Sequence, residues 1–268
     1  MSATPTSNPV TAGMLVIGDE ILSGRTKDKN IGTVADFCTE MGIELREVRV
    51  VADETDDIVA AINALRTRYT HVFTTGGIGP THDDITADAV AMAFEVALPI
   101  NDEAREIIET RLRKVNVEIN PSVLRMARIP EGATLIANPV SGAPGFRMGN
   151  VHVMAGVPKI MQAMLNEIAK TLTSGRKMLS RELPCGVGES TVSTGLGEIQ
   201  TEYPAVKIGS YPQMVNPQRD PDVAPVYAYI ALRSTNEALL DEATAKVKAL
   251  IDRLHAEKGI TLSEEPKP

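Results

Sequence analysis

The sequence predicts an α/β protein with a three-layer α/β/α arrangement around a mostly parallel sheet, followed by a small α+β domain. Up to Leu172, short apolar runs alternate with segments whose apolar residues recur at helical spacing, which is typical of parallel strands covered by helices. Two of these runs end at glycines, the usual place where such strands stop. After Thr173–Lys177 the order changes to strand, helix, strand, strand, helix. We therefore predict domains at 12–174 and 175–260.

The first domain opens with the apolar run Met14–Ile17, which predicts a buried strand ending at Gly18. After the polar loop Asp19–Lys29, Asn30 is a suitable cap for a helix that stops at Gly42. The later elements depend on the same two signals, a short apolar run for a strand and apolar residues three to four apart for a helix. They are strands at 43–51, 71–75 and 151–154, and helices near 58–65, 86–94, 101–115 and 158–172.

Two finer predictions concern the second half of this domain. In the helix at 101–115, Ile108, Leu112 and Val115 share one face and should point inward. The stretch 120–149 is rich in Pro and Gly and is predicted to be mostly irregular.

The second domain is predicted from shorter elements. They are strands at 179–185, 206–210 and 226–232, and helices that span 192–199 and 236–254. The prolines between the last two strands, from Pro212 to Pro225, indicate an ordered turn or a mobile loop. The apolar stripe of the last helix suits a dimerisation element as well as ordinary core packing, and we expect the chain to form a homo-oligomer.

Composition and charge exclude several classes of function. The formal net charge is −8 at pH 7 and there is no run of Lys and Arg, which argues against a nucleic-acid partner. Cys38 and Cys185 stand alone, so neither a zinc site nor a disulfide scaffold is expected. No apolar run reaches the roughly 20 residues of a membrane span, and the polar segment Met1–Thr11 does not resemble a signal peptide. We expect a cytoplasmic protein with no membrane partner.

The most informative segment connects the predicted strand 71–75 to the next helix. Three glycines follow the strand at its carboxyl end, where open α/β sheets bind their ligands. Without a Cβ, glycine lets backbone N–H groups approach a phosphate, and the following helix N-terminus adds partial positive charge. The pattern is neither the dinucleotide fingerprint nor the P-loop. The predicted phosphate cradle consists of Thr75, Gly76, Gly77, Gly79 and Thr81.

Two carboxylates stand beside this cradle, at Asp83 and Asp84. A bare phosphate would repel them, and the natural partner of both is a divalent cation that bridges carboxylate and phosphate oxygens. The plain alternative is that Asp84 or Thr86 caps the helix. Because three glycines and Thr81 are adjacent, we favour a phosphate–metal site in which Asp83 and Asp84 are catalytic.

A second polar segment follows the strand at 14–17, so it should lie at the same edge of the sheet as the cradle. The carboxylates within reach of a shared metal are Asp19, Glu20 and Asp28. The candidate contacts to phosphate or sugar are Ser23, Gly24 and Asn30. The alternative is a solvated loop in which Asn30 only caps a helix.

Two further turns are weaker candidates, because turns with Pro and Gly occur in many proteins. The ligand contacts expected from them are Ser141, Gly142, Pro144 and Gly145 in one turn, and Gly156 and Pro158 at a strand–helix junction. His82 lies inside the glycine motif, where it can touch a ligand. The sequence holds no G-x-S-x-G elbow, so a serine hydrolase is not supported.

Together these residues resemble a known family. The string Thr74–Thr86, with Gly18–Gly24 upstream and Ser141–Gly145 downstream, resembles the molybdopterin-binding domain of molybdenum-cofactor biosynthesis. It is most similar to the branch found in the N-terminal part of competence/damage-inducible protein A (CinA) and in the pterin-binding-like domain of eukaryotic FAD synthase. The similarity covers residues 12–172, and the smaller unit resembles the domain that follows in CinA. CinA usually continues into a nicotinamide-mononucleotide deamidase domain, and we do not carry that activity over.

The resemblance implies a three-layer α/β/α fold and one of two kinds of activity. The pterin branch binds or adenylylates molybdopterin, or inserts metal into it. The CinA and FAD-synthase branch hydrolyses nucleotide diphosphates such as ADP-ribose or FAD, helped by a divalent metal (Mg, Mn or Co) and by potassium. The motif positions map to the cradle, to Asp83 and Asp84, and to the candidate contacts of the N-terminal loop. One departure matters: Ala155 and Ile160 stand where the family often has Pro and Glu, which weakens or redirects activity if that Glu supports the site.

Three hypotheses are open at this point. The first is a metal-dependent nucleotide diphosphate hydrolase, in which the cradle holds the diphosphate and the carboxylates hold the ion. The second is a pterin-binding or adenylyl-transferring protein of molybdenum-cofactor biosynthesis. The third is a non-catalytic module, which only Ile160 supports. The sequence does not decide between a nucleotide diphosphate and a pterin as the small-molecule partner.

Overall fold

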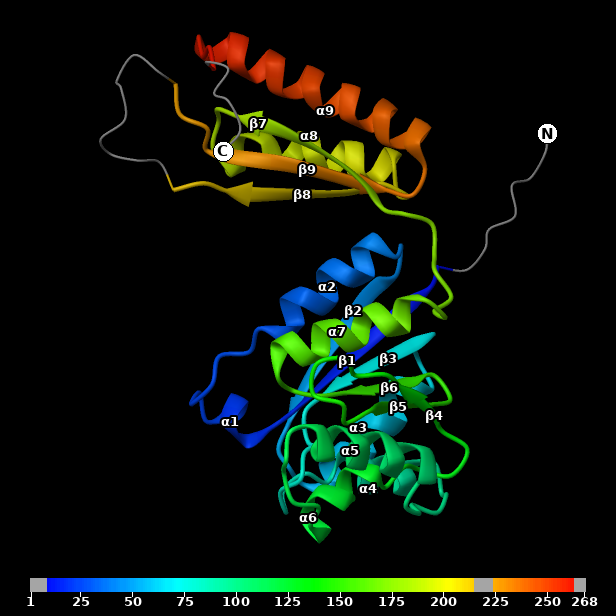
Figure 1. Cartoon of the computed structure of the whole chain (residues 1–268). Helices are drawn as coiled ribbons and strands as arrows, with labels where there is room; N and C mark the ends of the chain where they lie inside the picture. Colours follow the sequence, from blue (N-terminus) through cyan, green and yellow to red (C-terminus); the bar gives the residue numbers. More distant parts are fainter. Residues whose placement is uncertain (1–8, 215–223, 263–268) are drawn as a thin grey trace, which may run out of the picture. The chain divides into compact units, whose positions relative to one another are not determined.

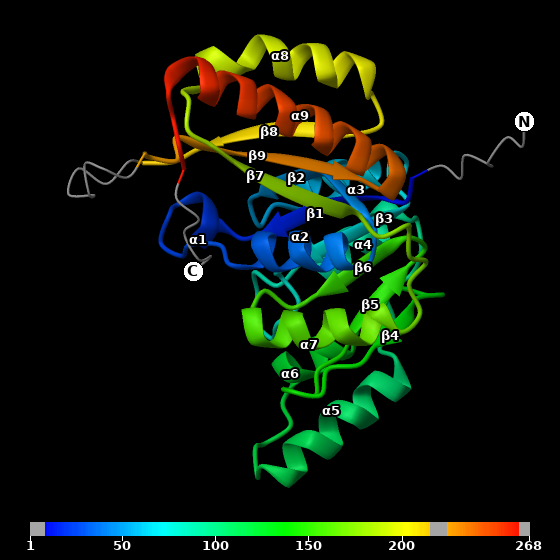
Figure 2. The same ribbon diagram turned by 90° about the horizontal axis from the view of Figure 1, so that it is seen from above.

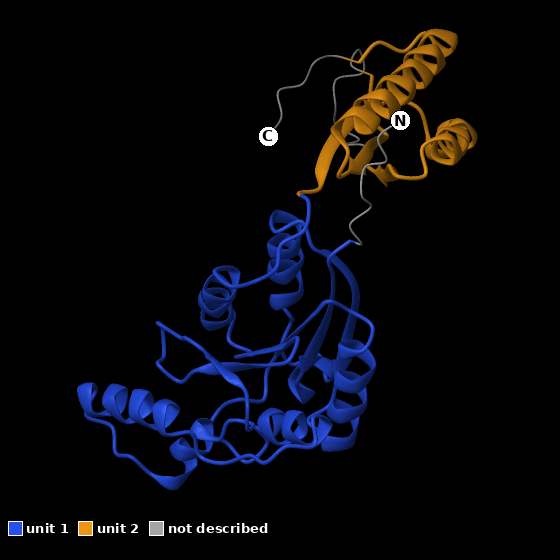
Figure 3. Ribbon diagram, turned by 90° about the vertical axis from the view of Figure 1, so that its right-hand side faces the viewer, with its two compact units in different colours: residues 1–176 blue, residues 177–268 orange. Residues whose placement is uncertain are grey.

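The computed structural model describes residues 9–214 and 224–262. The predictions for the polar lead-in before residue 9, for most of the proline-rich segment after Pro212 and for the chain end from residue 263 lie outside the described residues. The chain divides into two compact units, residues 1–176 and 177–268, which are blue and orange in Figure 3. Each unit has its own sheet and its own buried core, and each is described by itself.

A six-stranded sheet forms the middle of the first unit. Its strands are β1 (Thr11–Ile17), β2 (Glu44–Val51), β3 (His71–Thr75), β4 (Thr134–Ile136), β5 (Gly145–Met148) and β6 (Val151–Met154). In the order β2-β1-β3-β6-β5-β4, the first four strands are parallel, whereas β5 runs antiparallel to both β6 and β4. The predicted α/β class with a mostly parallel sheet is therefore confirmed.

Helices cover both faces of this sheet (Figures 1 and 2). One face carries α2 (Asn30–Glu40) and α7 (Pro158–Ala169), and the other carries α3 (Thr55–Arg66), α4 (Thr86–Ala93) and α5 (Asp102–Lys114). The division follows the alternation of side chains along β1. Met14 and Val16 pack on the side of α2 and α7, whereas Leu15 and Ile17 pack on the side of α3, α4 and α5. Both faces of the central strands are buried, and this burial includes the polar residues His71, Thr74, Thr75 and His152.

The structure tests two finer expectations in this unit. The stretch 120–149 is mostly irregular, as predicted, since 14 of its 30 residues lie in α6 (Pro121–Leu124), a 3₁₀ turn and the strands β4 and β5. Those strands are 3 and 4 residues long, too short for their alternation to be recognised. In α5, Ile108 is buried and Leu112 packs against the core, as predicted, whereas the prediction for Val115 is wrong: this residue is 49% exposed, because α5 ends one residue before it.

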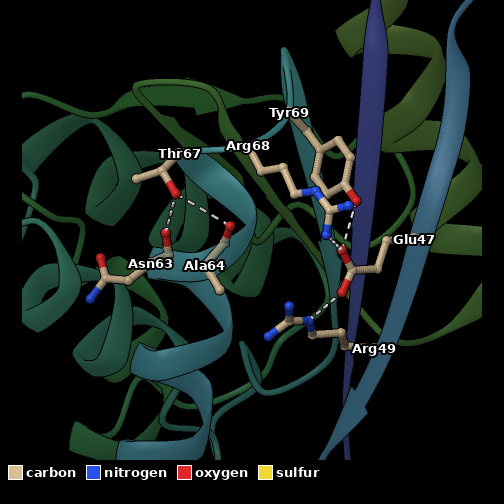
Figure 4. Close-up of polar contacts among 7 residues, drawn as sticks. All are labelled: Glu47, Arg49, Asn63, Ala64, Thr67, Arg68 and Tyr69. Carbon is tan, nitrogen blue, oxygen red and sulfur yellow. Dashed lines mark hydrogen bonds and ion pairs between the residues drawn. The ribbon is translucent and has the colours of Figure 1, made fainter.

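A polar cluster ties the edge strand β2 to the turn that follows α3 (Figure 4). The Glu47 carboxylate accepts hydrogen bonds from Tyr69 Oη at 2.6 Å, Arg49 Nε at 2.7 Å and Arg68 Nη1 at 3.2 Å. These donors, the Tyr69 hydroxyl first among them, lower the pKa of Glu47 below its usual value. The Tyr69 ring also packs over Gly13 of β1, where an added Cβ would lie 2.7 Å from ring carbon Cδ2. The cluster therefore joins β2, β1 and the start of β3.

The last residues of the first unit are bound to the amino ends of its strands. His71 Nε2 lies 3.2 Å from the carbonyl oxygen of Thr173, and His71 Nδ1 lies 3.4 Å from His152 Nε2. Because a carbonyl only accepts, we assign Nε2 of His71 as the donor and Nδ1 as the acceptor, so His152 donates within the pair. Two residues after Thr173, Gly175 N donates to the carbonyl oxygen of Met41 at 3.0 Å. The segment after α7 is therefore attached to the sheet up to this point.

The second unit is an antiparallel sheet with two helices on one face. Its elements are β7 (Leu179–Cys185), α8 (Glu189–Glu202), β8 (Lys207–Pro212), β9 (Ala228–Ser234) and α9 (Glu237–Lys258). The strand order is β7-β9-β8, and the predicted β-α-β-β-α arrangement is confirmed. The apolar stripe of α9, with Leu240 and Val247, is buried in the core of this unit. That stripe therefore serves core packing, and the homo-oligomer stays a prediction.

Within residues 9–214 and 224–262, no helix combines the length and the apolar composition that crossing a membrane requires.

Candidate functional site

Five connections meet at the carboxyl edge of the parallel strands in the first unit. Residues 18–29 follow β1, 52–54 follow β2, 76–85 follow β3 and 155–157 follow β6. Because β4 is antiparallel to β5, and β5 to β6, β4 ends at the same edge, so residues 137–144 join the other four. Residues from all five connections line a cavity of about 570 Å³, which we call the main cavity. Its size is typical of a small-molecule site.

Glycine backbone from two neighbouring strands forms one wall of the main cavity. Gly76 has φ +106° and Gly77 has φ +65°, a conformation that L side chains rarely adopt. A Cβ on Gly76 would lie 2.1 Å from the Ile17 carbonyl oxygen, and one on Gly77 would lie 2.2 Å from Thr86 Oγ1. Gly156 lies directly against Gly76, since its added Cβ would be 3.3 Å from the Gly76 Cα. Side chains are excluded at these positions, so a ligand can approach the backbone closely.

Two buried side chains donate hydrogen bonds to the carbonyl oxygens of these glycines. Thr86 Oγ1 donates to the Gly76 carbonyl oxygen at 2.9 Å, and Asn30 Nδ2 donates to the Gly156 carbonyl oxygen at 2.7 Å. Thr86 is 0% exposed and Asn30 is 5% exposed. The expectation that Asn30 caps α2 is wrong, because its amide reaches across to the connection after β6 and makes no capping bond.

The Asp84 carboxylate closes the loop that follows the glycines. Its Oδ1 accepts from Gly79 N at 2.6 Å, and its Oδ2 accepts from Thr81 N at 2.8 Å and Thr81 Oγ1 at 2.5 Å. Arg125 Nη2 donates to the Asp84 carbonyl oxygen at 3.3 Å. Both carboxylate oxygens are therefore engaged within the loop, and Asp84 shapes the cradle. Neither Asp84 nor Thr86 caps α4 through its side chain.

Four carboxylates gather at this edge of the sheet, and we call them the acidic cluster: Asp19, Glu20, Asp53 and Asp83. Asp53 Oδ2 accepts from Asp19 N at 2.9 Å, which joins the connection after β2 to the one after β1. Glu20, Asp53 and Asp83 line the main cavity, and all four line a second cavity of about 560 Å³ beside it. Burial raises the pKa of Asp53, and the charges of the other three raise it further, against the hydrogen bond from Asp19. The local field therefore favours a cation.

Asp53 was missing from the predicted site. In the sequence it stands with other acids just before and at the start of α3, which is a common feature of helix N-termini. A topological signal does identify it: β2 ends at Val51 and lies parallel to β1, so the residues after both strands share one edge of the sheet. The same rule placed Asp19 and Glu20 at that edge.

The donor set of the acidic cluster fits a hard divalent cation. Carboxylate oxygens suit Mg²⁺ and Mn²⁺, and Mg²⁺ is usually held by one or two carboxylates together with substrate phosphates. Across the described ranges, 9–214 and 224–262, no three His, Cys, Asp or Glu side chains are grouped closely enough to hold an ion by themselves. The cluster therefore fits a cation that the substrate helps to bind.

Charge around the main cavity is strongly one-sided. The lining residues that the structure describes include four carboxylates but no Lys or Arg. Gly76 N already donates to the Met154 carbonyl oxygen at 3.2 Å and Gly79 N to Asp84 at 2.6 Å. Positive potential therefore comes from the backbone around Gly77 and from the N-terminus of the 12-residue helix α7, which begins at Pro158 beside Gly156. An anionic ligand in this cavity therefore needs an accompanying cation to balance the carboxylates.

The structure brings much of the predicted site together. The predicted residues that line the main cavity are Glu20, Gly76, Gly77, Gly79, Asp83, Asp84, Ser141, Gly156 and Pro158. Asp19 and Ser23 line the second cavity. The predicted residues that line neither cavity are Thr75, Thr81, Gly24, Asp28, Asn30, Gly142, Pro144 and Gly145.

Several of these outlying residues have structural contacts instead. Asp28 accepts a hydrogen bond from Ile31 N at 2.8 Å at the start of α2. Thr75 is a buried strand residue, 1% exposed. Gly145 lies within β5, where an added Cβ would be 2.2 Å from the Val153 carbonyl oxygen.

Apolar side chains complete the main cavity, and the sequence analysis did not select them as site residues. Met126 comes from the 3₁₀ turn after α6, in the stretch predicted to be irregular, and no local signal points to it. Val157 and Ile160 come from the start of α7. Ile160 had been noted only as a departure from the family pattern.

Comparison with known proteins gives the relationships of the chain. A family described as "Probable molybdopterin binding domain" matches residues 13–174, and "FAD synthase, middle domain" matches residues 177–258. Protein PAE0875 of Pyrobaculum aerophilum is 31% identical over 257 residues, which cover 92% of this chain and 97% of that protein. A CinA-like protein of Desulfosudis oleivorans is 35% identical over 209 residues, covering 74% of this chain and 51% of its own length. The match thus spans about half of that relative.

A solved structure is similar to part of the chain. It is the crystal structure of the protein CinA, described as of unknown function, from Thermoplasma acidophilum. Its sequence is 34% identical, its TM-score is 0.56, and the match covers 60% of this chain and 97% of that one.

Proposed function

The chain belongs to the molybdopterin-binding domain family in its CinA-like form, as its motifs predicted, and on this premise we propose that its first unit is a metal-dependent hydrolase of nucleotide diphosphates. The substrates proposed are compounds of the ADP-ribose or FAD type, cleaved at the diphosphate into two monophosphates. The observation that carries the proposal is the presence of a glycine-backbone cradle and the acidic cluster around one cavity.

Binding of the diphosphate is proposed to use the backbone at Gly77, between Gly76 and Gly79, together with the N-terminus of α7. The absence of Lys and Arg among the described lining residues supports a requirement for a cation at the binding step as well as in the chemistry. Without that cation, the phosphate charges would face four carboxylates. Affinity for ADP-ribose should therefore depend on the divalent metal.

The acidic cluster is proposed to supply part of the ligands of the divalent ion, Mg, Mn or Co, from Glu20 and Asp83, and the phosphates of the substrate are proposed to supply the others. A bound ion supplies electrostatic stabilisation for the charge that develops on the phosphate oxygens. Asp83 is the proposed catalytic carboxylate, because its side chain is 61% exposed beside the cradle. Asp84 is a positioning residue, because both of its carboxylate oxygens hold the loop. Potassium, which the family resemblance implies, stays an untested expectation.

The proposed reaction is hydrolysis. A water oxygen attacks one phosphorus, the bond from that phosphorus to the bridging oxygen breaks, and the electron pair leaves with the second phosphate. Asp53 is the proposed acceptor of the water proton, since it lines the main cavity together with Glu20 and Asp83 and its Oδ2 is fixed by Asp19 N. The glycine cradle keeps the diphosphate oriented for this attack.

The central test is Asp83→Asn, assayed on ADP-ribose with Mg²⁺, Mn²⁺ and Co²⁺ with identification of both products. We expect kcat/KM to fall about 100-fold or more, because the variant removes one charge of the ion site. The melting temperature should be unchanged, because the substitution does not disturb the fold. Asp36→Asn, an exposed carboxylate on α2, is the matched control and should retain activity. Full activity of Asp83→Asn would refute the role of Asp83, and no turnover of any diphosphate with any metal would refute the function.

The second candidate is a pterin-binding or adenylyl-transferring protein of molybdenum-cofactor biosynthesis, which the description of the matching family favours. Tight molybdopterin binding without hydrolysis of any nucleotide would select it. The absence of a melting shift with nucleotides, pterins and metals would select a non-catalytic module instead.

A further inference from the structure

The main cavity has a wall of apolar side chains apart from its carboxylates. This apolar wall consists of Ile78, Met126, Ala143, Val157 and Ile160. The wall is anchored in the two buried cores of the first unit: Met126 and Ala143 pack against the core beneath α3 and α4, and Ile160 packs against the core beneath α2 and α7. Because these contacts exist without a ligand, the wall is preformed.

The apolar wall and the acidic cluster occupy different parts of the main cavity. Glu20, Asp53 and Asp83 also line the second cavity of about 560 Å³. Ile78 and Met126 instead line a small cavity of about 20 Å³, and no residue lines both neighbouring cavities. The part of the main cavity at Ile78 and Met126 is therefore distinct from the part at the acidic cluster, and the glycine loop lines the main cavity with both.

The polar side chains next to the apolar wall have little hydrogen-bonding capacity left. Asn138 Nδ2 donates to Ser141 Oγ at 2.6 Å and to the Ala143 carbonyl oxygen at 2.8 Å. Its Oδ1 accepts from the N–H groups of Val140 and Ser141, both at 3.1 Å. The amide thus makes all four of its bonds within its own loop. Of the described side chains that line the main cavity, Ser141 and Thr26 keep a hydroxyl proton to donate, and Thr26 belongs to the connection that also carries Glu20.

We propose that the apolar wall packs the face of a heterocyclic base, so that the site requires a base but hardly distinguishes one base from another. The proposal rests on the proposed function, because the diphosphate on the glycine loop brings the base to this wall. Every base has an apolar face, whereas the bases differ in the hydrogen-bonding groups of their edges. A wall without partners for those edges cannot strongly reject one base in favour of another. The substrate class is therefore nucleoside diphosphate esters in general.

The test compares ADP-glucose, GDP-glucose and UDP-glucose, which share one sugar, with dimethyl diphosphate, which has two ester groups and no base. With Mg²⁺, we expect kcat/KM for the three nucleotide sugars to lie within about tenfold of one another. Dimethyl diphosphate should be at least about 100-fold poorer, because it gains nothing from the wall. A preference above about 100-fold for one base, or equal activity on dimethyl diphosphate, would overturn the proposal.

Two variants test the wall itself, Met126→Gln and Ile160→Asn. Each should raise KM about tenfold for all three nucleotide sugars, with little change in kcat and none for dimethyl diphosphate. Met126→Leu keeps an apolar side chain and should retain the wild-type KM, which separates loss of the wall from loss of folding. The matched controls are Met92→Gln and Ile107→Asn, which replace the same residue types at positions 56% and 38% exposed. Unchanged KM in both wall variants would overturn the proposal.

A binding measurement separates failure of this proposal from failure of the proposed function. The Mg²⁺-dependent melting shift is recorded for the same compounds, because it requires no turnover. Similar shifts with all three nucleotide sugars, reduced in Met126→Gln, would support the apolar wall even if no compound is hydrolysed. Hydrolysis of all compounds, unaffected by either wall variant, would support the hydrolase function and refute the binding of a base by the apolar wall.

Discussion

His152 links the stability of the first unit to pH. It lies on β6, stacks on the Phe73 ring with centroids 5.3 Å apart, and is 2% exposed. Burial lowers its pKa to about 3, and the neighbouring His71 and Arg147 add to this effect. Within the described part of the chain its Nδ1 has no hydrogen-bond partner. Protonation would therefore place an unpaired charge in the core.

The sign and size of the effect follow from this shift. Because the folded-state pKa lies below the ordinary value of 6.5, the unfolded chain takes up the proton first as the pH falls. The stabilisation is complete above pH 6.5 and is lost progressively as the pH falls toward 3. Between pH 7.5 and 5, His152 alone should lower the free energy of unfolding by about 2 kcal/mol. Burial also lowers the pKa of His71, which acts in the same direction.

The perturbation is His152→Gln, whose amide does not titrate and can still donate to His71 Nδ1. Urea unfolding followed by far-ultraviolet circular dichroism gives the free energy of unfolding at several pH values between 7.5 and 5. We expect the variant to lose about 2 kcal/mol less than the wild type over this interval. His82→Gln, at a side chain that is 99% exposed, is the control and should keep the wild-type slope. Parallel curves for wild type and His152→Gln would refute the reasoning.

Three further predictions concern local geometry. Gly77→Ala should lower the free energy of unfolding by at least about 1 kcal/mol and abolish the melting shift with ADP-ribose, because Gly77 has a φ of +65° and its added Cβ would contact Thr86. The control Gly32→Ala, with nothing within 4 Å of the added Cβ, should be neutral or stabilising. Equal effects of the two variants would contradict this account. Asp84→Asn should destabilise the chain by about 2 kcal/mol in thermal unfolding, because it weakens charged hydrogen bonds to the loop, and an unchanged melting temperature would count against it. Tyr69→Phe should cost about 1 kcal/mol through loss of the 2.6 Å bond to Glu47, and a double-mutant cycle with Glu47→Gln checks that the loss belongs to this pair.

Elements with a strong local signal were predictable from the sequence. The short runs at His71–Thr75 and Val151–Met154 coincide with β3 and β6, because each combines apolar or β-branched residues with a stop close to a glycine. The short strands β4 and β5 carry no such signal. They form because β5 can pair with β6, a contact that depends on the assembled sheet.

The candidate site shows the same division between local and distant information. The run of glycines predicts an open backbone, and Gly76 and Gly77 do have conformations and neighbours that exclude a side chain. Asp53 and Met126 reach the same cavity only through the order of the strands and the path of the connections, which no short motif contains. The sequence also presents Asp83 and Asp84 as equivalent. The structure separates them, because Asp84 is engaged with the loop and Asp83 lines the cavity beside the other acids.

The attachment of residues 173–175 to the sheet has a practical consequence for anyone who wishes to produce the first unit alone. A chain shortened to end at Leu172 would remove the Thr173 acceptor and leave the buried His71 Nε2 without its partner. It would also uncover the backbone at Gly42, where an added Cβ would lie 2.4 Å from the Arg176 carbonyl oxygen. A chain that ends after Arg176 keeps these contacts. We therefore expect the fragment that ends at Arg176 to be more stable than the one that ends at Leu172.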